Sequence, residues 1–474
     1  MALTDFAIIR RSMWSRRLAT IVSALSVSVA VALLCVLLSM RDAGQRAFQR
    51  GTGNMHILVS AEQSPLAGVL NAVYYAGPPQ RKITVGDLRS AGLVGASLGA
   101  APADGRVAWT IPVQLGDSFR GFKTLATIPD FFSKFEPAAG TPWIFAQGSA
   151  FKDTWEIVLG AESARVTGLR LGEVIFVTHG WSDAGHAVVA GDTPATTPVA
   201  ENAAAPKPGV SNMEEAPDIH REHPFKVVGI LGPTGLAHDR AIFLPIEASW
   251  ILHAEDNREA EEAAKTPASG APKAGEAEEH HEHIEVKDLR PAEQVLSAAY
   301  VRCKSNTIIG AVFSGLRARS DMTAALPANQ VRDLLGIVSS IDRILLAMAA
   351  VVLIGSGATV LLAMYGSMEQ RRRQVAVLRV LGASRLRILG LVLTESAVIA
   401  AAGAAAGVVI AQGGMWLAST AFAQATNIII PASIDFGWGL IVAVGAVLVG
   451  ALAGTIPALR AYGLSVVEGL RPVG

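Results

Sequence analysis

Four long stretches of apolar residues dominate the hydrophobic pattern of the chain, one near its start and three near its end. The first, Leu18 to Met40, has 23 residues and no charged side chain. The others are Ile344 to Tyr365, Ile388 to Gln412 and Gly437 to Ile456. Because a helix needs about 20 predominantly apolar residues to cross a bilayer, the pattern predicts four transmembrane helices. The first is longer than the apolar part of a secretory leader, about 7 to 15 residues, so we expect it to be retained.

The stretch between the first two apolar runs, residues 41–343, has the short apolar runs and frequent polar residues of a water-soluble domain. Strand-like and helix-like runs alternate there, for example Glu156 to Leu159 followed by Ala161 to Val166. This mixture predicts a large α+β domain inserted between transmembrane helices 1 and 2. The other expected strands are 55–60, 108–115, 174–178, 226–231, 241–246 and 297–303, and a further expected helix is 308–319.

Two parts of this domain have a different composition. Residues near 182–217 and 254–287 are rich in Ala, Pro, Glu, Gly and Thr and contain almost no large apolar side chain. Such segments bury too little apolar surface to offset the entropy lost on ordering. We therefore expect two disordered or mobile low-complexity insertions.

Basic residues mark one side of the membrane. Four arginines lie in residues 1–17, six in residues 366–387 and two in residues 457–474, whereas the connection 413–436 has no Lys or Arg. Because basic residues accumulate on the cytoplasmic side, both termini and the connection 366–387 are expected in the cytoplasm. Residues 1–17 are expected to form an amphipathic helix on that leaflet, or else a simple basic leader to the next helix.

Composition and charge exclude several classes of function. The chain is 51% hydrophobic and 17% charged, with a mean hydropathy of +0.39, which is too apolar for an ordinary soluble protein. Its formal net charge is zero, so nothing favours a nucleic-acid partner. The sequence has no phosphate-binding GxxxxGK[ST] loop, GxSxG elbow, HExxH pair or CxxC. We expect no covalent chemistry from this chain, and a membrane-anchored hydrolase would lack a recognisable catalytic set.

One stretch has the residues of a metal site. Glu278 to Glu285 reads EEHHEHIE, and imidazoles among carboxylates bind zinc or copper. The candidate ligands are His280, His281 and His283. A solvated acidic linker that happens to contain histidine explains the stretch better, because no second ligand group has a fixed spacing.

Glu395 is the ionisable residue that lies well within a predicted transmembrane helix. A carboxylate there is costly in lipid, so we expect it to face another helix or a polar partner. It is interpreted either as a coupling or gating contact or as a hydrogen-bonded packing residue. The GxxxG pairs Gly403 with Gly407 and Gly450 with Gly454 predict close helix packing.

The arginine-rich connection 366–387 has a pattern of its own. We expect a helix through Leu381, a break at Gly382, and Ser384 as the N-cap of the next helix. An apolar stripe that includes Val377 and Val380 would then lie between arginines. The positive-inside rule explains the arginines alone, whereas a docking surface for a cytosolic partner explains both features.

The segment from Glu369 to Ile399, EQRRRQVAVLRVLGASRLRILGLVLTESAVI, resembles the signature of permease subunits of the MacB/FtsX/LolC-type ABC transporter superfamily. The resemblance extends to residues 121–132 and 157–177 and to the C-terminal PALRAYGLSVVEGLRP. Gln374 departs from it, because the family usually has an acidic residue there. Ala376, Leu378, Arg379, Leu381, Gly382, Ala383, Ser384 and Glu395 match that signature residue by residue. The positions expected to carry ATPase coupling are Arg373, Ala376, Val377, Leu378, Arg379, Val380, Leu381, Gly382, Ala383 and Ser384.

The resemblance implies a multi-pass protein of the bacterial inner membrane with a large periplasmic domain. Such permeases work as dimers, with a second copy or a paralogue, and pair with a cytosolic ABC ATPase that binds ATP and Mg. No cofactor is expected on this chain itself. The implied role is mechanotransmission, in which ATP hydrolysis moves the periplasmic domain to export or extract a lipoprotein, peptide, drug or metal-related substrate. The alternative is an FtsX-like regulator that activates a periplasmic cell-wall hydrolase.

Overall fold

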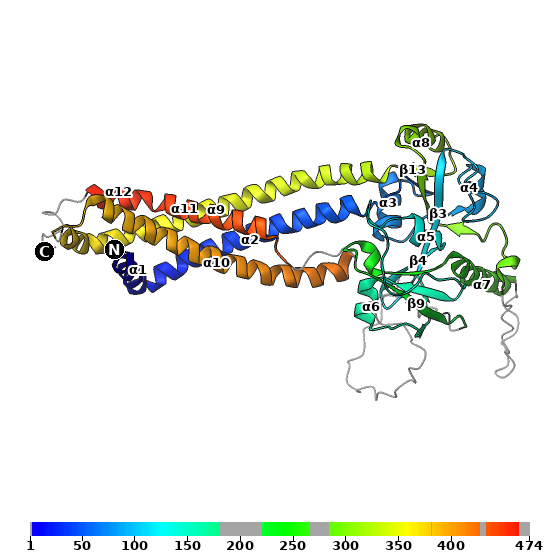
Figure 1. Ribbon diagram of the computed structural model, residues 1–474, viewed down its shortest axis with the longest axis horizontal. Coiled ribbons are helices and arrows are strands. Elements are labelled where there is room, and N and C mark those ends of the chain that lie inside the picture. The colour runs from blue at the N-terminus through cyan, green and yellow to red at the C-terminus, as the bar shows by residue number, and fades with distance from the viewer. Residues whose placement is uncertain are drawn as a thin grey trace, which may run out of the picture. The chain divides into compact units, whose positions relative to one another are not determined.

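The computed structural model describes residues 2–180, 220, 222–265, 284–380, 382–426 and 433–463. The chain divides into two compact units (Figure 1). The first comprises Met1–Arg46, Leu334–Ala425 and Ile430–Gly474, and the second comprises Ala47–Asp333 and Thr426–Ile429. We call them the helical unit and the sheet unit.

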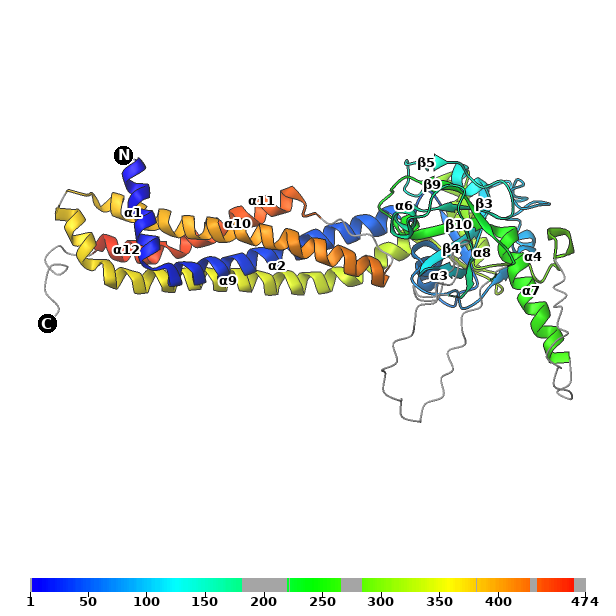
Figure 2. The ribbon, with the colours of Figure 1, turned by 90° about the horizontal axis from the view of Figure 1, so that it is seen from below.

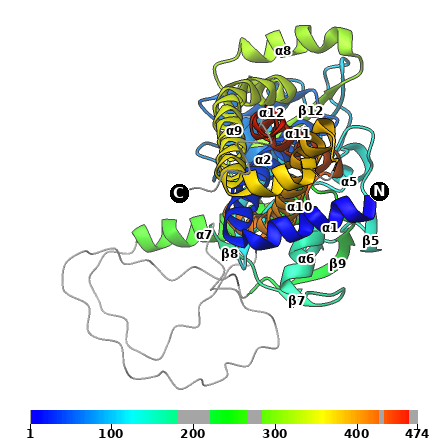
Figure 3. The same ribbon diagram turned by 90° about the vertical axis from the view of Figure 1, so that its left-hand side faces the viewer.

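The helical unit is built from long apolar helices that lie side by side in all three views (Figures 1, 2 and 3). In the described part of the chain, four helices are long and apolar enough to cross a membrane, which confirms the number of predicted spans. The helices are α1 (Ala2–Ser15), α2 (Arg17–Arg50), α9 (Pro327–Val380), α10 (Arg385–Thr426), α11 (Phe436–Ala453) and α12 (Thr455–Gly463).

Apolar side chains in the helical unit lie both inside and outside the bundle. Val31, Val360 and Ile399 are among the buried residues that form its core. On the outer faces, Ile354 and Leu448 are 66% and 59% exposed. A water-soluble bundle would carry polar residues there, so these faces fit a lipid environment.

The sheet unit contains a mixed sheet of 11 strands in the order β13-β1-β12-β3-β4-β10-β6-β9-β5, with β7 paired to β9 and β8 to β3. The pairs β10–β4 and β6–β9 are parallel and the other pairs are antiparallel. A separate pair is formed by β2 (Ile83–Thr84) and β11 (Val295–Leu296). The strands of the main sheet are β1 (Ile57–Ser60), β3 (Val107–Phe119), β4 (Phe122–Thr127), β5 (Phe145–Gly148), β6 (Glu156–Leu159), β7 (Val174–Ile175), β8 (Thr178–His179), β9 (Phe225–Leu231), β10 (Ala241–Pro245), β12 (Ala298–Cys303) and β13 (Thr323–Ala325).

Short helices and an aromatic cluster complete the sheet unit. Phe131 is fully buried, and its ring lies 5.0 Å from that of Phe135 and 5.5 Å from those of Trp143 and Phe243. The helices are α3 (Pro65–Tyr74), α4 (Val85–Ser90), α5 (Asp130–Lys134), α6 (Ala161–Thr167), α7 (Ile246–Lys265) and α8 (Ile309–Arg317), with 3-10 turns η1 (Ala237–Arg240), η2 (Val286–Asp288) and η3 (Asn306–Ile308).

The expected α+β character is confirmed, and each expected strand coincides with an observed strand to within a few residues. The boundary of the second insertion is wrong, because Ala254 to Lys265 belongs to α7. The composition of this segment did not predict a helix, because polar side-chain contacts and not apolar residues stabilise it. Arg258 donates from Nε and Nη2 to both carboxylate oxygens of Glu293, at 3.0 and 2.9 Å, and His223 lies 2.6 Å from Glu255.

The remaining boundaries differ in simpler ways. The expected loop 413–436 is helical as far as Thr426, because α10 continues through an alanine-rich stretch without proline. The helices α2 and α9 extend beyond the predicted spans at both ends. The first expected insertion, 182–217, lies outside the described residues.

Candidate coupling segment and intramembrane contacts

The connection between α9 and α10 has the backbone that its sequence predicts. α9 is helical through Val380, and α10 begins at Arg385. Gly382 has a φ of +90°. The N–H of Arg387 donates to Ser384 Oγ at 3.3 Å and to Ser384 O at 3.1 Å, so Ser384 is the N-cap. The expected helix is present as far as Val380, Leu381 being outside the described residues, and the expected break and cap are both present.

Gly382 is required by its backbone conformation and not by crowding. A φ of +90° lies in the region that L side chains rarely adopt, and a Cβ atom built there would meet no atom within 4 Å. The turn is therefore open to solvent while its geometry depends on glycine.

Two exposed apolar residues flank this turn. Val380 and Leu386 are 64% and 74% exposed, whereas Ala383 packs against the buried core of the bundle and Ile388 belongs to that core. The turn is thus attached to the bundle on one side and presents apolar surface on the other. The predicted coupling positions Arg373, Ala376, Val377, Leu378 and Arg379 lie on the helical backbone of α9, their side chains and the whole of Leu381 being outside the described residues.

Glu395 has the polar partner that its position required. The residue is 4% exposed, and Ser12 on α1 donates from Oγ to its Oε1 at 2.6 Å. This distance is typical of a strong hydrogen bond to a carboxylate. The contact joins α1 to α10 across 383 positions of sequence. Sequence reasoning missed Ser12, because a single serine on an amphipathic helix carries no signal of its own.

The GxxxG pairs lie at close helix contacts of the bundle. A Cβ atom on Gly403 would lie 2.6 Å from the carbonyl oxygen of Ala24, and one on Gly407 would lie 2.6 Å from that of Ser28. α10 therefore packs on α2 through backbone that only glycine exposes. Gly454 makes the equivalent contact from α11 to α10, where a Cβ atom would lie 2.1 Å from Ser396 Oγ.

The predicted metal ligands His280, His281 and His283 lie outside the described residues. The structure instead gathers other histidines of the sheet unit. His179 and His253 lie beside Asp117, and His179 also lies near His220 and Asp256. These residues are far apart in the sequence, with 139 positions between Asp117 and Asp256. Their spacing therefore gives no indication that they lie together.

A comparison with known families bears on the α9–α10 connection. Residues 346–466 match the family described as FtsX-like permease C-terminal. The matched stretch starts within α9, includes Gly382, Ser384 and Glu395, and extends beyond α12. No curated protein matches the chain. Residues 346–466 are thus similar to an FtsX-like permease C-terminal domain, which supports the resemblance of the chain's motifs to the MacB/FtsX/LolC-type ABC permease superfamily.

Proposed function

We propose that the chain is the membrane subunit of an ABC transporter in the inner membrane of a bacterium, with both termini in the cytoplasm. In this role it converts ATP hydrolysis by a separate cytosolic ATPase into movement of its periplasmic domain. The family match supports a permease role with an ATPase partner in general. The more specific role, mechanotransmission by a dimer, is our inference from the helical unit.

The observation that carries the proposal is the turn at Gly382. It joins two candidate membrane spans. It has a fixed glycine conformation and a serine cap, and exposed Val380 and Leu386 flank it. A partner that buries these two side chains gains apolar contact. Because the glycine conformation and the serine cap fix where α9 ends and α10 begins, the partner would bind a turn of defined position.

The closely packed bundle supports transmission of a movement from that turn. Gly403 and Gly407 hold α10 against α2, and the Glu395–Ser12 hydrogen bond holds α10 against α1. A displacement at the start of α10 would therefore move α1 and α2 with it, because close-packed helices shift as units. α9 is also one continuous helix from Pro327, in the sheet unit, to Val380.

The test is ATP hydrolysis by the reconstituted complex. The full chain and its ABC ATPase are purified together, placed in lipid nanodiscs and assayed with Mg-ATP. Replacing Val380 and Leu386 together with Asp should reduce stimulation of the ATPase by at least about fivefold, the lower range of typical coupling energies. Gly382→Val should have a similar effect, because valine disfavours the φ of +90° at that position.

Two matched variants serve as controls. Ile144→Asp makes the same kind of change at a side chain that is 68% exposed in the sheet unit, and Gly390→Ala changes a helical glycine of α10 with no atom within 4 Å of the new Cβ. Both should leave stimulation unchanged. Normal stimulation in the Val380/Leu386 and Gly382 variants, with the complex intact, would contradict the proposal.

A further inference from the structure

Five side chains from four parts of the sheet unit lie close together. Asp117 lies on β3, His179 ends β8, and His253 and Asp256 lie one turn apart on α7. His220 precedes β9. The ligand atoms of Asp117, His179 and His253 all lie within 4.8 Å of one another, as do those of His179, His220 and Asp256.

The separations are too long for hydrogen bonds and match those between ligands of one metal ion. Asp117 Oδ1 lies 3.6 Å from His179 Nδ1 and 3.8 Å from His253 Nε2. Hydrogen bonds between such atoms measure about 2.7 to 3.2 Å. Ligand atoms bound at about 2.1 Å to a tetrahedral ion lie about 3.4 Å from one another. The two distances from Asp117 Oδ1 are therefore close to the edge length of a coordination tetrahedron.

The ring of His253 is oriented for coordination by a contact on its far side. Its Nδ1 lies 2.7 Å from the carbonyl oxygen of Ser249, to which only an N–H can donate. Nδ1 is thus the donor of this hydrogen bond, and Nε2 is the nitrogen on the side of Asp117. Metal-binding histidines are commonly fixed in this way, by a hydrogen bond from the nitrogen that does not bind the ion.

The Asp117 side chain is 1% exposed, and its Oδ1 accepts no hydrogen bond from the residues that the structure describes. A buried carboxylate oxygen without a donor is costly, and such atoms are rare in folded proteins. A cation bound between Oδ1 and the two imidazoles would satisfy it.

We propose that Asp117, His179 and His253 bind a divalent transition-metal ion of the zinc class. Asp256 lies beside these three ligands, with its Oδ2 3.6 Å from His179 Nδ1, and a water would take the fourth position of a tetrahedral ion. Imidazole nitrogen and carboxylate oxygen are the donors that such ions take in tetrahedral sites. The proposal concerns the sheet unit and does not rest on the permease role.

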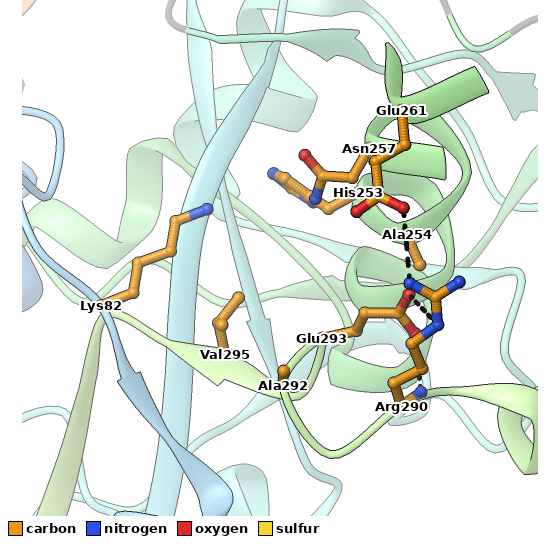
Figure 4. Close-up of a pocket in the computed structure, with 9 residues that line it drawn as sticks. All are labelled: Lys82, His253, Ala254, Asn257, Glu261, Arg290, Ala292, Glu293 and Val295. Carbon is orange, nitrogen blue, oxygen red and sulfur yellow. Dashed lines mark hydrogen bonds and ion pairs between the residues drawn. The ribbon is translucent and has the colours of Figure 1, made fainter. Parts of the chain in front are cut away.

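A cavity of about 530 Å³ adjoins the site at His253, which is one of its lining residues. Figure 4 shows His253, Asn257 and Lys82 among its lining residues. Burial lowers the pKa of Lys82, and the charge of Asp117 partly offsets this effect.

Gly116, beside Asp117 on β3, provides the space for the His253 ring. A Cβ atom there would lie 3.1 Å from His253 Nε2 and 3.3 Å from its Cε1. Alanine at this position would press on the coordinating nitrogen without removing any ligand. The site thus depends on a residue that has no metal-binding atom of its own.

The test is Zn²⁺ binding to the full chain in detergent, measured by competition with a chromophoric chelator. We expect one tightly bound ion per chain. Asp117→Asn and His179→Ala should each weaken binding at least about tenfold, the smallest loss typical of residues that merely support a ligand. His179 is 48% exposed, so its replacement tests the site even if Asp117→Asn fails to fold. Gly116→Ala should weaken binding with all ligands present.

Two control variants separate this site from other sources of binding. His280, His281 and His283 replaced together by Ala should leave the tight ion in place. Asp130→Asn, at a carboxylate that pairs with Lys134 on the surface, should also have no effect.

Co²⁺ in the same site should give the intense visible absorption of tetrahedral coordination, and His253→Ala should abolish it. Unchanged affinity in His179→Ala and His253→Ala, or loss of the ion in the triple variant alone, would overturn the proposal.

Discussion

The helical unit and the sheet unit bury polar groups in opposite ways. In the helical unit, the buried carboxylate of Glu395 is satisfied by Ser12, and the contact fastens two helices together. In the sheet unit, Asp117 Oδ1 is buried without a hydrogen bond while two imidazoles stand just beyond reach. A buried carboxylate that accepts a hydrogen bond stabilises the fold, whereas a buried carboxylate oxygen that lacks a donor indicates a ligand.

The two units also pack by different means. The sheet unit fills its core with large rings around Phe131, which bury apolar surface from water. The helical unit brings backbones together at Gly403 and Gly407, because lipid offers no hydrophobic force between helices and close contact must replace it. The sheet unit should therefore be most sensitive to the loss of a large side chain, and the helical unit to the enlargement of a small one.

The largest effect is expected for Phe131→Ala. Phe131 is fully buried among Phe135, Trp143 and Phe243, and removal of such a ring costs about 3 to 5 kcal/mol. Unfolding of the sheet unit, followed by the near-ultraviolet signal of its tryptophans, should shift to lower denaturant concentration. Val166→Ala, at a side chain that is 52% exposed, should change the stability by less than about 0.5 kcal/mol. Equal effects would refute the assignment of the core.

The second effect is expected from enlarging a glycine in the helical unit. Gly403→Leu places a side chain against the Ala24 carbonyl oxygen and the Cβ of Val27, which lie 2.6 and 2.8 Å from the built Cβ. We expect a loss of about 1 to 3 kcal/mol in the free energy of unfolding in detergent. Gly413→Leu is the matched control on the same helix, because no atom lies within 4 Å of its Cβ. If both variants are equally stable, α10 does not pack on α2 through Gly403.

The third prediction concerns the dependence of the sheet unit on pH. Burial lowers the pKa of His238 to about 3, and its Nδ1 contacts the Tyr75 hydroxyl. The unfolded chain binds this proton with a pKa of about 6.5. The stability from a neutral His238 is therefore complete above about pH 6.5 and is lost as the pH falls toward 3. At pH 5 the loss is about 2 kcal/mol relative to pH 7.

The measurement for His238 is a comparison of variants at two pH values. His238→Gln keeps an acceptor for Tyr75 but does not titrate. The difference in unfolding free energy between pH 7 and pH 5 should be about 2 kcal/mol smaller in this variant than in the original chain. Other titrating groups contribute equally to both proteins. The same difference in both would mean that His238 is not buried in its neutral form.

The sequence predicted those features that depend on local pattern. Apolar runs predicted the four candidate spans, and alternating positions predicted strands such as β6 and β9. The turn at Gly382 and the cap at Ser384 were also predicted, since each depends on one residue and its immediate neighbours. Helix α7 beyond Ala254 was missed, because the ion pair of Arg258 with Glu293 holds it from 35 positions away.

The candidate sites differ in the same way, between residues that are neighbours in the sequence and residues that are distant in it. The expected coupling positions stay a prediction, and the sequence could offer them because they lie together between Arg373 and Ser384. The partner of Glu395 could not be named from the sequence. The His and Asp cluster was beyond sequence reasoning, because β3, β8 and α7 meet only through the order of the sheet. The local motif that the sequence did offer, at His280, lies outside the described residues.

The smallest effect is expected at an ion pair on the surface of the helical unit. Arg41 Nε on α2 lies 3.4 Å from Asp342 Oδ2 on α9, and the two side chains are 35% and 19% exposed. Because water and salt screen such pairs, a double-mutant cycle with Arg41→Ala and Asp342→Asn should give a coupling of about 0.2 to 1 kcal/mol. The coupling should fall as salt is raised toward 1 M, where the screening length is about 3 Å. The Glu395–Ser12 contact, measured by the same cycle with Ser12→Ala and Glu395→Gln, should not respond to salt, because Glu395 is 4% exposed. Equal salt dependence of the two couplings would mean that solvent reaches Glu395, and the contrast between a satisfied buried carboxylate and the open one at Asp117 would then fail.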